Sequence, residues 1–231
     1  MLLLDLFCKA GGAGQGYADA GFTVVGVDIK PQPNYPGQFV CADVLHLEPW
    51  FLRAFDAIHA SPPCQFASAI TPDHSRHVNL IPPTRDLLER AGRPYVIENV
   101  EGARAHLRNP LLLCGPMFGL GATIDGERYD LERHRLFECV GFTVAAPPHK
   151  HTGRPVVGVY GNHVRRRAGK HRTGGGTGKT RDLPDGVSHT DIAREALGMP
   201  WGSLAELSEA IPPAYTRYIG EALRHACDRL R

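Results

Sequence analysis

The sequence predicts an α/β fold with a mostly parallel sheet and a small, basic, loop-rich insertion. Over residues 1–100, short apolar runs alternate with helix-like stretches, which is typical of βαβ units. Each apolar run ends in polar residues, glycine or proline, where open α/β sheets bind their ligands. A chain of 231 residues is long enough to form one such domain with a full core.

The expected elements follow from these apolar runs and from the helical periodicity between them. Segment 64–83 is rich in Ser, Thr, His and Pro, and a loop of this length in a compact domain is usually functional or disordered. We expect strands over residues 2–7, 23–28, 38–42, 57–60, 95–99, 111–113 and 136–140. We expect helices over residues 14–20, 84–91, 191–197 and 215–229.

The positive charge is concentrated in one segment. Residues 149–181 contain nine Lys and Arg residues and no Asp or Glu, although the net charge of the whole chain is only +2. A basic segment on an otherwise acidic body indicates a local surface that binds a polyanion.

The cysteines and the apolar runs indicate the compartment. The six cysteines include no Cys-x-x-Cys pair, so we expect neither disulfides nor a cysteine zinc site, and the cytoplasm is the expected location. The apolar start of the chain is too short for a signal sequence, and no run reaches the roughly 18 apolar residues of a membrane span.

The first predicted strand leads into a turn suited to an adenosine-containing ligand. The turn follows Asp5, Leu6 and Phe7 and contains Gly11 and Gly12, whose missing side chains let a ligand approach the backbone. Asp28 ends the second predicted strand, where an acid can bind two ribose hydroxyls, and Asp43 follows the third. Taken alone, these residues also fit a tight turn with two solvated acids.

Two further motifs follow the fourth and fifth predicted strands. They are Ser61-Pro62-Pro63-Cys64-Gln65 and Glu98-Asn99-Val100, and Arg133-His134-Arg135 and Ala210-Ile211-Pro212-Pro213 come later. In this order and at about this spacing, the chain resembles the DNA cytosine-5 methyltransferase family. That family has Asp-Leu-Phe-x-Gly-x-Gly-Gly, Pro-Cys-Gln, Glu-Asn-Val, Gln-x-Arg-x-Arg and a final motif ending in Val-Pro-Pro. The resemblance covers residues 1–140 and 195–225.

The reaction of that family needs a nucleophile and an acid. Carbon 5 of cytosine is a poor nucleophile, and a thiolate that adds to carbon 6 activates it toward the methyl group of S-adenosylmethionine. Cys64 is the expected nucleophile, and Glu98 is expected to neutralise the charge at N3. The resemblance implies that Arg135 holds the cytosine O2 and that Arg133 supports the site.

The resemblance also implies a Rossmann-like, S-adenosylmethionine-dependent fold and a set of ligand contacts. The expected cofactor residues are Asp5, Phe7, Gly11, Gly12, Asp28, Asp43, Val44, Pro63 and Ile211. The expected DNA contacts are Gln65, Ser68, Arg165, Arg166, Arg167, Lys170, Arg172 and Lys179. A base inside a duplex must be flipped out to reach such a pocket, and segment 64–83 is long enough to close over it.

These motifs divide the chain into three expected parts: a catalytic and cofactor-binding domain (1–148), a target-recognition insertion (149–190) and C-terminal helices (191–231). We expect a monomer that binds double-stranded DNA, with no membrane and no metal. His149, His151, His163 and His171 form no recognisable ligand set in the sequence and are assigned to the polar DNA face.

The chain departs from the family pattern at several positions. Lys9 replaces the first glycine of the cofactor turn, Ala67 replaces a phenylalanine, Leu131 replaces the glutamine before Arg-x-Arg, and Ser208-Glu209 replaces Gly-Asn. With the short insertion, these changes suit a compact phage-type or orphan modification enzyme, with or without a partner restriction nuclease.

Three other functions remain open from the sequence: an RNA (tRNA) cytosine-5 methyltransferase, a catalytically silent DNA-binding protein of the same fold, and a small-molecule methyltransferase. The last leaves the basic segment without a purpose. Residues 174–180 imitate a phosphate-binding P-loop, but Thr173 stands where its first glycine belongs and no apolar strand precedes it, so we exclude nucleotide hydrolysis.

Overall fold

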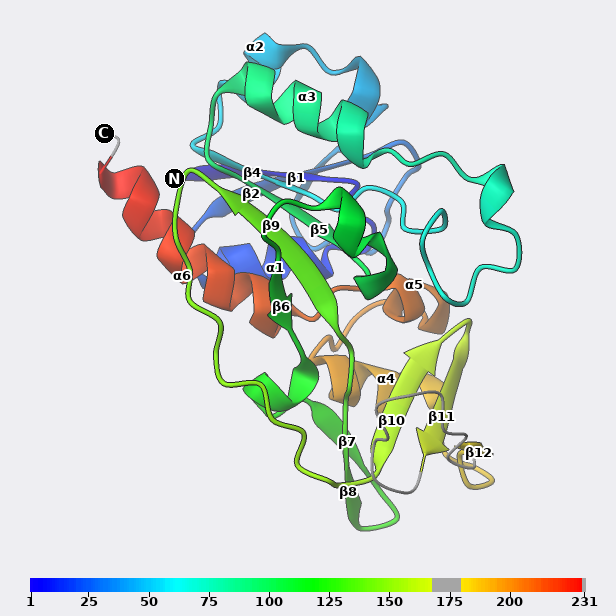
Figure 1. Ribbon diagram of the computed structural model, residues 1–231. Helices are drawn as coiled ribbons and strands as arrows, with labels where there is room; N and C mark the ends of the chain where they lie inside the picture. Colours follow the sequence, from blue (N-terminus) through cyan, green and yellow to red (C-terminus); the bar gives the residue numbers. More distant parts are fainter. Residues whose placement is uncertain (168–179, 230–231) are drawn as a thin grey trace.

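The computed structural model describes residues 1–167 and 180–229, and it contains a large and a small sheet (Figure 1). The large sheet has the order β3-β2-β1-β4-β5-β9-β6, in which β1 to β5 are parallel and β9 is antiparallel to both of its neighbours. This confirms the expected α/β fold with a mostly parallel sheet. Its strands are β1 (Leu2–Leu6), β2 (Thr23–Asp28), β3 (Gln38–Cys41), β4 (Ala57–Ala60), β5 (Tyr95–Asn99), β6 (Leu111–Leu113) and β9 (Arg135–Val140).

Helices cover both faces of the large sheet (Figure 1). The helices α2 (Pro49–Leu52) and α3 (Ile81–Ala91) cover one face, and α1 (Gly12–Asp19) and α6 (Pro213–Arg229) cover the other. Consecutive strand residues point to opposite faces, so Leu4 packs in the core under α3 and Leu3 packs in the core under α1 and α6. The apolar composition of the strands therefore reflects burial on both sides.

The small sheet has the order β12-β11-β10-β8-β7. Its strands are β7 (Gly121–Ile124), β8 (Glu127–Asp130), β10 (Val156–Tyr160), β11 (His163–Arg167) and β12 (Thr180–Asp182), and it packs with α4 (His189–Leu197) and α5 (Leu204–Glu209). One buried cluster joins residues from all of these except β12, including Ile124, Val159, Val164, Ala196 and Leu207.

Residues 149–190 contribute β10, β11 and β12 to this sheet, and buried side chains of β10 and β11 belong to the shared cluster. Each strand of that segment offers only a few apolar side chains, and the partners that bury them come from β7, β8 and α4, far away in the sequence.

Local signals account for the helix ends. The prolines at 82 and 83 lie in the first turn of α3, where a missing N–H costs nothing, so this helix begins earlier than the expected residue 84. It ends at Gly92, whose φ of 66° is left-handed. Short 3-10 turns connect other elements: η1 (Val44–His46), η2 (His74–Arg76), η3 (Glu101–His106) and η4 (Gly115–Phe118).

Within the described residues, no helix has both the length and the apolar character needed to cross a membrane.

A buried arginine joins the large sheet to the small one. Arg133 is fully buried, and its guanidinium donates hydrogen bonds to the carbonyl oxygens of Ala210 (3.0 Å), Val159 (2.9 Å) and Ser208 (2.7 Å). The Tyr215 hydroxyl donates to the carbonyl of Arg133 itself at 2.6 Å. Burial lowers the Arg133 pKa to about 10, so the side chain stays charged at neutral pH.

We expect Arg133→Met to lower the free energy of unfolding by about 3 kcal/mol or more. The variant leaves three backbone carbonyls without their charged donor. Each buried carbonyl without a partner lowers the stability by about 1–3 kcal/mol. Urea denaturation measures this, and Arg165→Met is the control because Arg165 is largely exposed. Equal losses in the two variants would show that the Arg133 hydrogen bonds do not hold the sheets together.

Candidate active site

The sulfhydryl, the carboxyl and the guanidinium singled out in the sequence meet at one edge of the large sheet. Cys64 follows β4, Glu98 lies near the end of β5, and Arg135 begins β9. Because β9 is antiparallel to β5, it starts at the edge where β4 and β5 end. Arg135 Nε lies 3.1 Å from Glu98 Oε1, and both side chains are nearly buried. The large sheet thus brings together residues that are far apart in the sequence.

Burial decides the protonation of this group. The pKa of the half-buried Cys64 thiol is raised, first by desolvation and then by the charge of Glu98, while Arg135 opposes the rise. The pKa of Glu98 is also raised by burial, and Arg135, the Ser61 hydroxyl and Arg133 oppose it. The site therefore holds a neutral thiol beside a carboxyl that is easier to protonate than an exposed one.

Hydrogen bonds fix the two motif loops to each other. The Asn99 side-chain amide donates to the carbonyl of Pro62 at 2.9 Å, and its oxygen accepts from the N–H of Val100 at 3.0 Å. A Cβ at Gly102 would lie 2.1 Å from the carbonyl oxygen of Ala67, so the Cys64 loop and η3 pack backbone against backbone. Asn99 therefore positions the loop that carries Cys64.

A buried chain of polar side chains leads to this site, and the motifs do not reveal it. The Tyr17 hydroxyl lies 3.0 Å from His59 Nδ1, and His59 Nε2 lies 2.7 Å from Ser61 Oγ. Burial lowers the His59 pKa to about 3, so the ring is neutral. The sequence signal is a histidine in the otherwise apolar fourth strand.

The expected cofactor turn has the backbone geometry of a tight ligand-binding turn. Phe7, Lys9 and Gly11 have φ values of 58°, 47° and 80°. A Cβ at Gly12 would lie 2.3 Å from the carbonyl oxygen of Ile211, so the first and last motifs touch. Strain at the two non-glycine residues is characteristic of functional turns.

The two acids near this turn lie where the sequence predicts. Asp28 ends β2, and its two carboxylate oxygens accept the N–H groups of Lys9 (3.2 Å) and Lys30 (3.1 Å), leaving further lone pairs on each oxygen. Asp43 caps η1 by accepting from the N–H of Leu45 at 3.0 Å, with Val44 buried beside it. Pro63, the remaining expected cofactor contact, is exposed.

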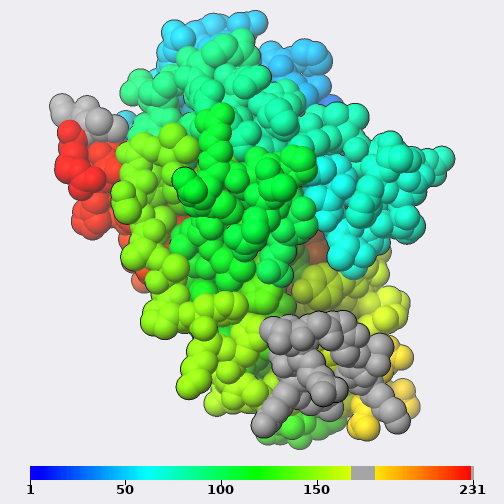
Figure 2. Space-filling model, in the orientation of Figure 1, coloured from blue at the N-terminus to red at the C-terminus, as the bar shows by residue number. Residues whose placement is uncertain are grey.

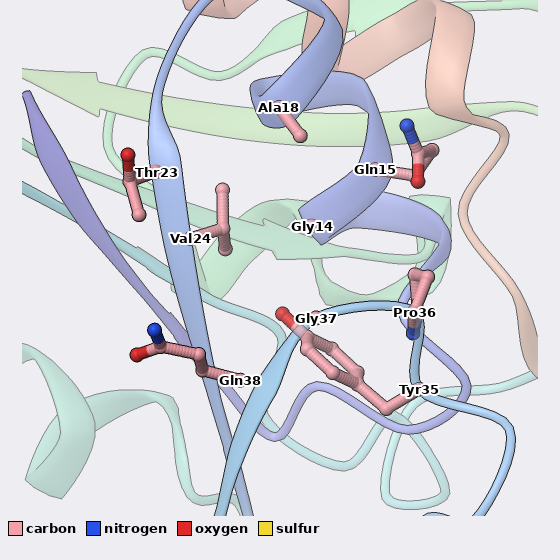
Figure 3. A pocket seen from close by; sticks show the side chains of 9 residues that line it. All are labelled: Gly14, Gln15, Ala18, Thr23, Val24, Tyr35, Pro36, Gly37 and Gln38. Atoms are coloured by element: carbon pink, nitrogen blue, oxygen red, sulfur yellow. The ribbon is translucent and has the colours of Figure 1, made fainter.

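An aromatic side chain not foreseen from the sequence fills the space behind the turn. Tyr35 lies beneath Gly14 of α1 and lines a groove with residues of β2 and β3 (Figure 3). A Cβ at Gly14 would lie 2.6 Å from the Tyr35 hydroxyl and 2.8 Å from Asp5 Oδ2. Asp5 is fully buried here, and desolvation raises its pKa to about 8.

The Asp5 pKa predicts how stability depends on pH. Its folded pKa of about 8 exceeds the ordinary value of 3.8, so its stabilising contribution is complete below pH 3.8 and is lost as the pH rises to 8. His59 acts in the opposite direction between about pH 3 and 6.5. Between pH 6.5 and 8 we expect stability to fall by roughly 1 kcal/mol per pH unit through Asp5.

Denaturation of Asp5→Asn across this pH range tests that expectation, because the variant has no carboxyl to ionise and its stability curve should be flatter than that of the wild type. Asp86→Asn, at an exposed position of α3, is the control and should keep the wild-type slope. Parallel curves for wild type and Asp5→Asn would contradict the assignment.

Two departures from the family pattern form an ion pair. Lys9 Nζ lies 3.2 Å from Glu209 Oε2, and both side chains are half exposed. They line a cleft of about 380 Å³, which also includes Ile70, Asn162 and Ser208. The Lys9 ammonium therefore lies beside the Glu209 carboxylate. The two residues that differ from the family pattern at positions 9 and 209 have opposite charges, which compensate each other.

Segment 64–80 and the small sheet lie on the same side of the molecule as this cleft. The segment stands out from the body above β10 and β11 (Figures 1 and 2), and Gln65 and Ser68 at its start are half-buried. In β11, Arg165 and Arg167 share one face, while Arg166 pairs with Asp125 at 3.6 Å. Arg167 pairs with Glu132 at 3.4 Å. Lys170, Arg172 and Lys179 lie outside the described residues.

The histidines assigned to the DNA face lie in two different places. His149 and His151 converge with His134 and Cys114, and one possible ligand atom from each of the four lies within 4.8 Å of the others, which the sequence spacing did not reveal. His163 instead packs against His189, with ring centroids 5.7 Å apart. His171 lies outside the described residues.

Comparison with known proteins shows the fold. No family model and no curated protein matches the sequence, but solved structures match the fold. A protein encoded within an E. coli prophage and assigned as a DNA modification methyltransferase aligns over 99% of both chains, with a TM-score of 0.63 and 17% identity. The methyltransferase EhMeth of Entamoeba histolytica aligns over 100% of this chain and 99% of its own (TM-score 0.62, 10% identity).

Dnmt2 of S. pombe aligns over 100% of this chain and 99% of its own, with a TM-score of 0.57 and 13% identity. This chain has a methyltransferase fold. The alignments cover the small sheet as well as the large one, so the likeness in fold extends over the whole chain.

Proposed function

We propose that this protein transfers a methyl group from S-adenosylmethionine to carbon 5 of cytosine in double-stranded DNA. The observation that carries the proposal is the group formed by Cys64, Glu98 and Arg135 at the carboxyl edge of the large sheet. A thiol, a carboxyl with a raised pKa and an arginine are the three groups that addition to a cytosine ring needs.

The residues of the first turn fit S-adenosylmethionine. The acids Asp28 and Asp43 stand beside it at the ends of neighbouring strands, where ribose hydroxyls and an adenine amino group would find acceptors. When bound, this cofactor supplies an electrophilic methyl group on a sulfonium. Lys9, paired with Glu209, presents less repulsion to that cation than a free ammonium would.

The chain's own residues carry the remaining steps. The Cys64 thiol gives its proton to a water molecule, its sulfur forms a bond to carbon 6 of the flipped cytosine, and the electron pair of the ring's double bond becomes available at carbon 5. Glu98 shares its proton with N3, and Arg135 stabilises charge at O2 while it holds the Glu98 carboxyl in place. After methyl transfer, a water molecule takes the carbon 5 proton, the Cys64 sulfur leaves carbon 6 as a thiolate, and the N3 proton returns to Glu98, which restores the aromatic ring.

The small sheet and segment 64–80 are the proposed DNA surface. Arg165 and Arg167 would contact phosphates, which position a protein on DNA without reading its sequence. Gln65 and Ser68 lie next to the nucleophile, where they would contact the flipped nucleotide or the gap it leaves. None of the six cysteines, all of which lie in the described part of the chain, forms a disulfide, which fits the reducing cytoplasm of a bacterial or phage-infected cell.

Methyl transfer to different nucleic acids tests the proposal. Purified protein is incubated with methyl-labelled S-adenosylmethionine and, in parallel, with duplex DNA or with tRNA, and the products are digested to nucleosides for mass spectrometry. We expect 5-methyldeoxycytidine from the DNA. Product in the tRNA alone would assign the same chemistry to RNA, and product in neither would refute the proposal. Bisulfite sequencing of the modified DNA then reads the target site.

A further inference from the structure

Four side chains that the methyl-transfer chemistry does not use converge beside the active site. Cys114 follows β6, His134 precedes β9, and His149 and His151 lie in the loop between β9 and β10. The Cys114 sulfur and one nitrogen from each histidine all lie within 4.8 Å of one another. The four ligands come from three segments of the chain, at residues 114, 134 and 149–151. The fold brings these three segments together.

The spacing of the three histidine nitrogens matches the edges of a small coordination polyhedron. The Nε2 atoms are 3.0 Å apart between His149 and His151, and 3.3 Å apart in the other two pairs. Ligands at a Zn–N distance of about 2.0–2.1 Å in a tetrahedral site lie roughly 3.3 Å apart. The Cys114 sulfur lies 3.8 Å from His151 Nε2, near the roughly 3.6 Å expected between a sulfur and a nitrogen ligand.

Hydrogen bonding among the rings does not account for this arrangement. A neutral imidazole has one N–H and one acceptor nitrogen, so a single Nε2 atom cannot donate to one ring and accept from another. Here each Nε2 atom faces two others at hydrogen-bonding distance. A cation at their centre satisfies all three lone pairs at once.

Carboxylates hold the far side of two of the rings. His134 Nδ1 lies 2.9 Å from Glu101 Oε2, and His151 Nδ1 lies 3.2 Å from Glu132 Oε1. The Glu132 side chain is only 7% exposed. A carboxylate that accepts from Nδ1–H leaves the Nε2 lone pair free to bind a metal, which is the usual outer arrangement of histidine ligands.

We propose that Cys114, His134, His149 and His151 bind one zinc ion. A thiolate with three imidazoles suits zinc, and four protein ligands leave no open position, which is typical of a structural site. The ion would join the end of β6, the start of β9 and the loop that leads to the small sheet. Because His134 precedes Arg135, it would also fix the strand that presents this arginine to Glu98. The inference is independent of methyl transfer.

Metal content is the first test. The full-length, untagged protein is expressed in medium supplemented with zinc, dialysed, and measured by plasma mass spectrometry. We expect one zinc per chain in the wild type and in the control His225→Ala, whose histidine is exposed on α6. In Cys114→Ser and His149→Ala we expect the zinc content to fall to a small fraction of that. Wild-type protein without zinc, or variants with wild-type content, would overturn the proposal.

Cobalt provides a readout that does not depend on how each variant folds in the cell. Co²⁺ added to metal-free wild-type protein should give the intense visible bands of a tetrahedral site and a near-ultraviolet band from the thiolate. Cys114→Ser should lose the thiolate band, and Glu132→Gln should bind zinc about 10–100-fold more weakly in competition with a chelator. A cobalt spectrum that is octahedral, or that is unchanged in Cys114→Ser, would contradict this ligand set.

Discussion

Cys64→Ser should abolish methyl transfer, with a loss of at least about 10³-fold, because a serine hydroxyl at the same position is far less nucleophilic than a thiolate and no ring activation follows. The rate is measured with labelled S-adenosylmethionine on duplex DNA. Cofactor and DNA binding, measured separately by calorimetry and by gel shift, should stay close to wild type, since the Cys64 side chain is small and half-buried.

Cys41→Ser is the matched control, because Cys41 is a free and exposed cysteine on β3. It should keep the wild-type rate. Residual activity in Cys64→Ser above about one-hundredth of the wild type would mean that another group carries the reaction, and the proposed role of Cys64 would be withdrawn.

Glu98→Gln should lower the single-turnover rate by about 10²–10⁴-fold, the usual contribution of a positioned acid or base. Glutamine keeps the size of the side chain and can accept a hydrogen bond from Arg135. Its amide is not an acid, so it cannot transfer a proton to N3. The loss should therefore appear in the rate of the chemical step, while the affinity for S-adenosylmethionine stays the same. Rapid-quench kinetics with saturating cofactor separates the two.

The control for this prediction is Glu89→Gln, at an exposed position of α3 where the carboxylate pairs with Arg108. Its rate should match the wild type. A Glu98→Gln variant with normal chemistry but weakened DNA binding would instead make Glu98 a residue that only positions Arg135.

The large sheet could be predicted from the sequence because its central strands β1, β4 and β5 are buried on both faces. These strands are therefore largely apolar, as in Leu2–Leu4 and Tyr95–Ile97, and polar residues follow at their carboxyl ends. The motifs that follow these strands then fall at one sheet edge by topology alone. Topology therefore groups Cys64 with Glu98, and the resemblance to the DNA cytosine-5 methyltransferase family added Arg135 to them.

The small sheet could not be predicted in the same way. Its strands are short, β11 has one buried valine followed by three consecutive arginines, and its core depends on α4 from later in the chain. Local sequence patterns do not predict contacts between residues that are far apart in the sequence. Examples are the packing of Tyr35 near Asp5 and the ion pair between Lys9 and Glu209. The proposed zinc ligands Cys114, His134, His149 and His151 come from separate segments of the chain. The sequence therefore shows no closely spaced zinc-binding motif.

Covalent trapping tests the central claim most directly. A long duplex is synthesised with 5-fluorocytosine in place of every cytosine, so that any recognition site is included, and is incubated with the protein and S-adenosylmethionine. Fluorine cannot leave carbon 5 as a proton does, so the enzyme stays bonded to carbon 6 after methylation. We predict a complex that survives denaturation, requires the cofactor, maps by peptide mass spectrometry to Cys64 and is absent in Cys64→Ser. No adduct, or an adduct on another cysteine, would contradict the account.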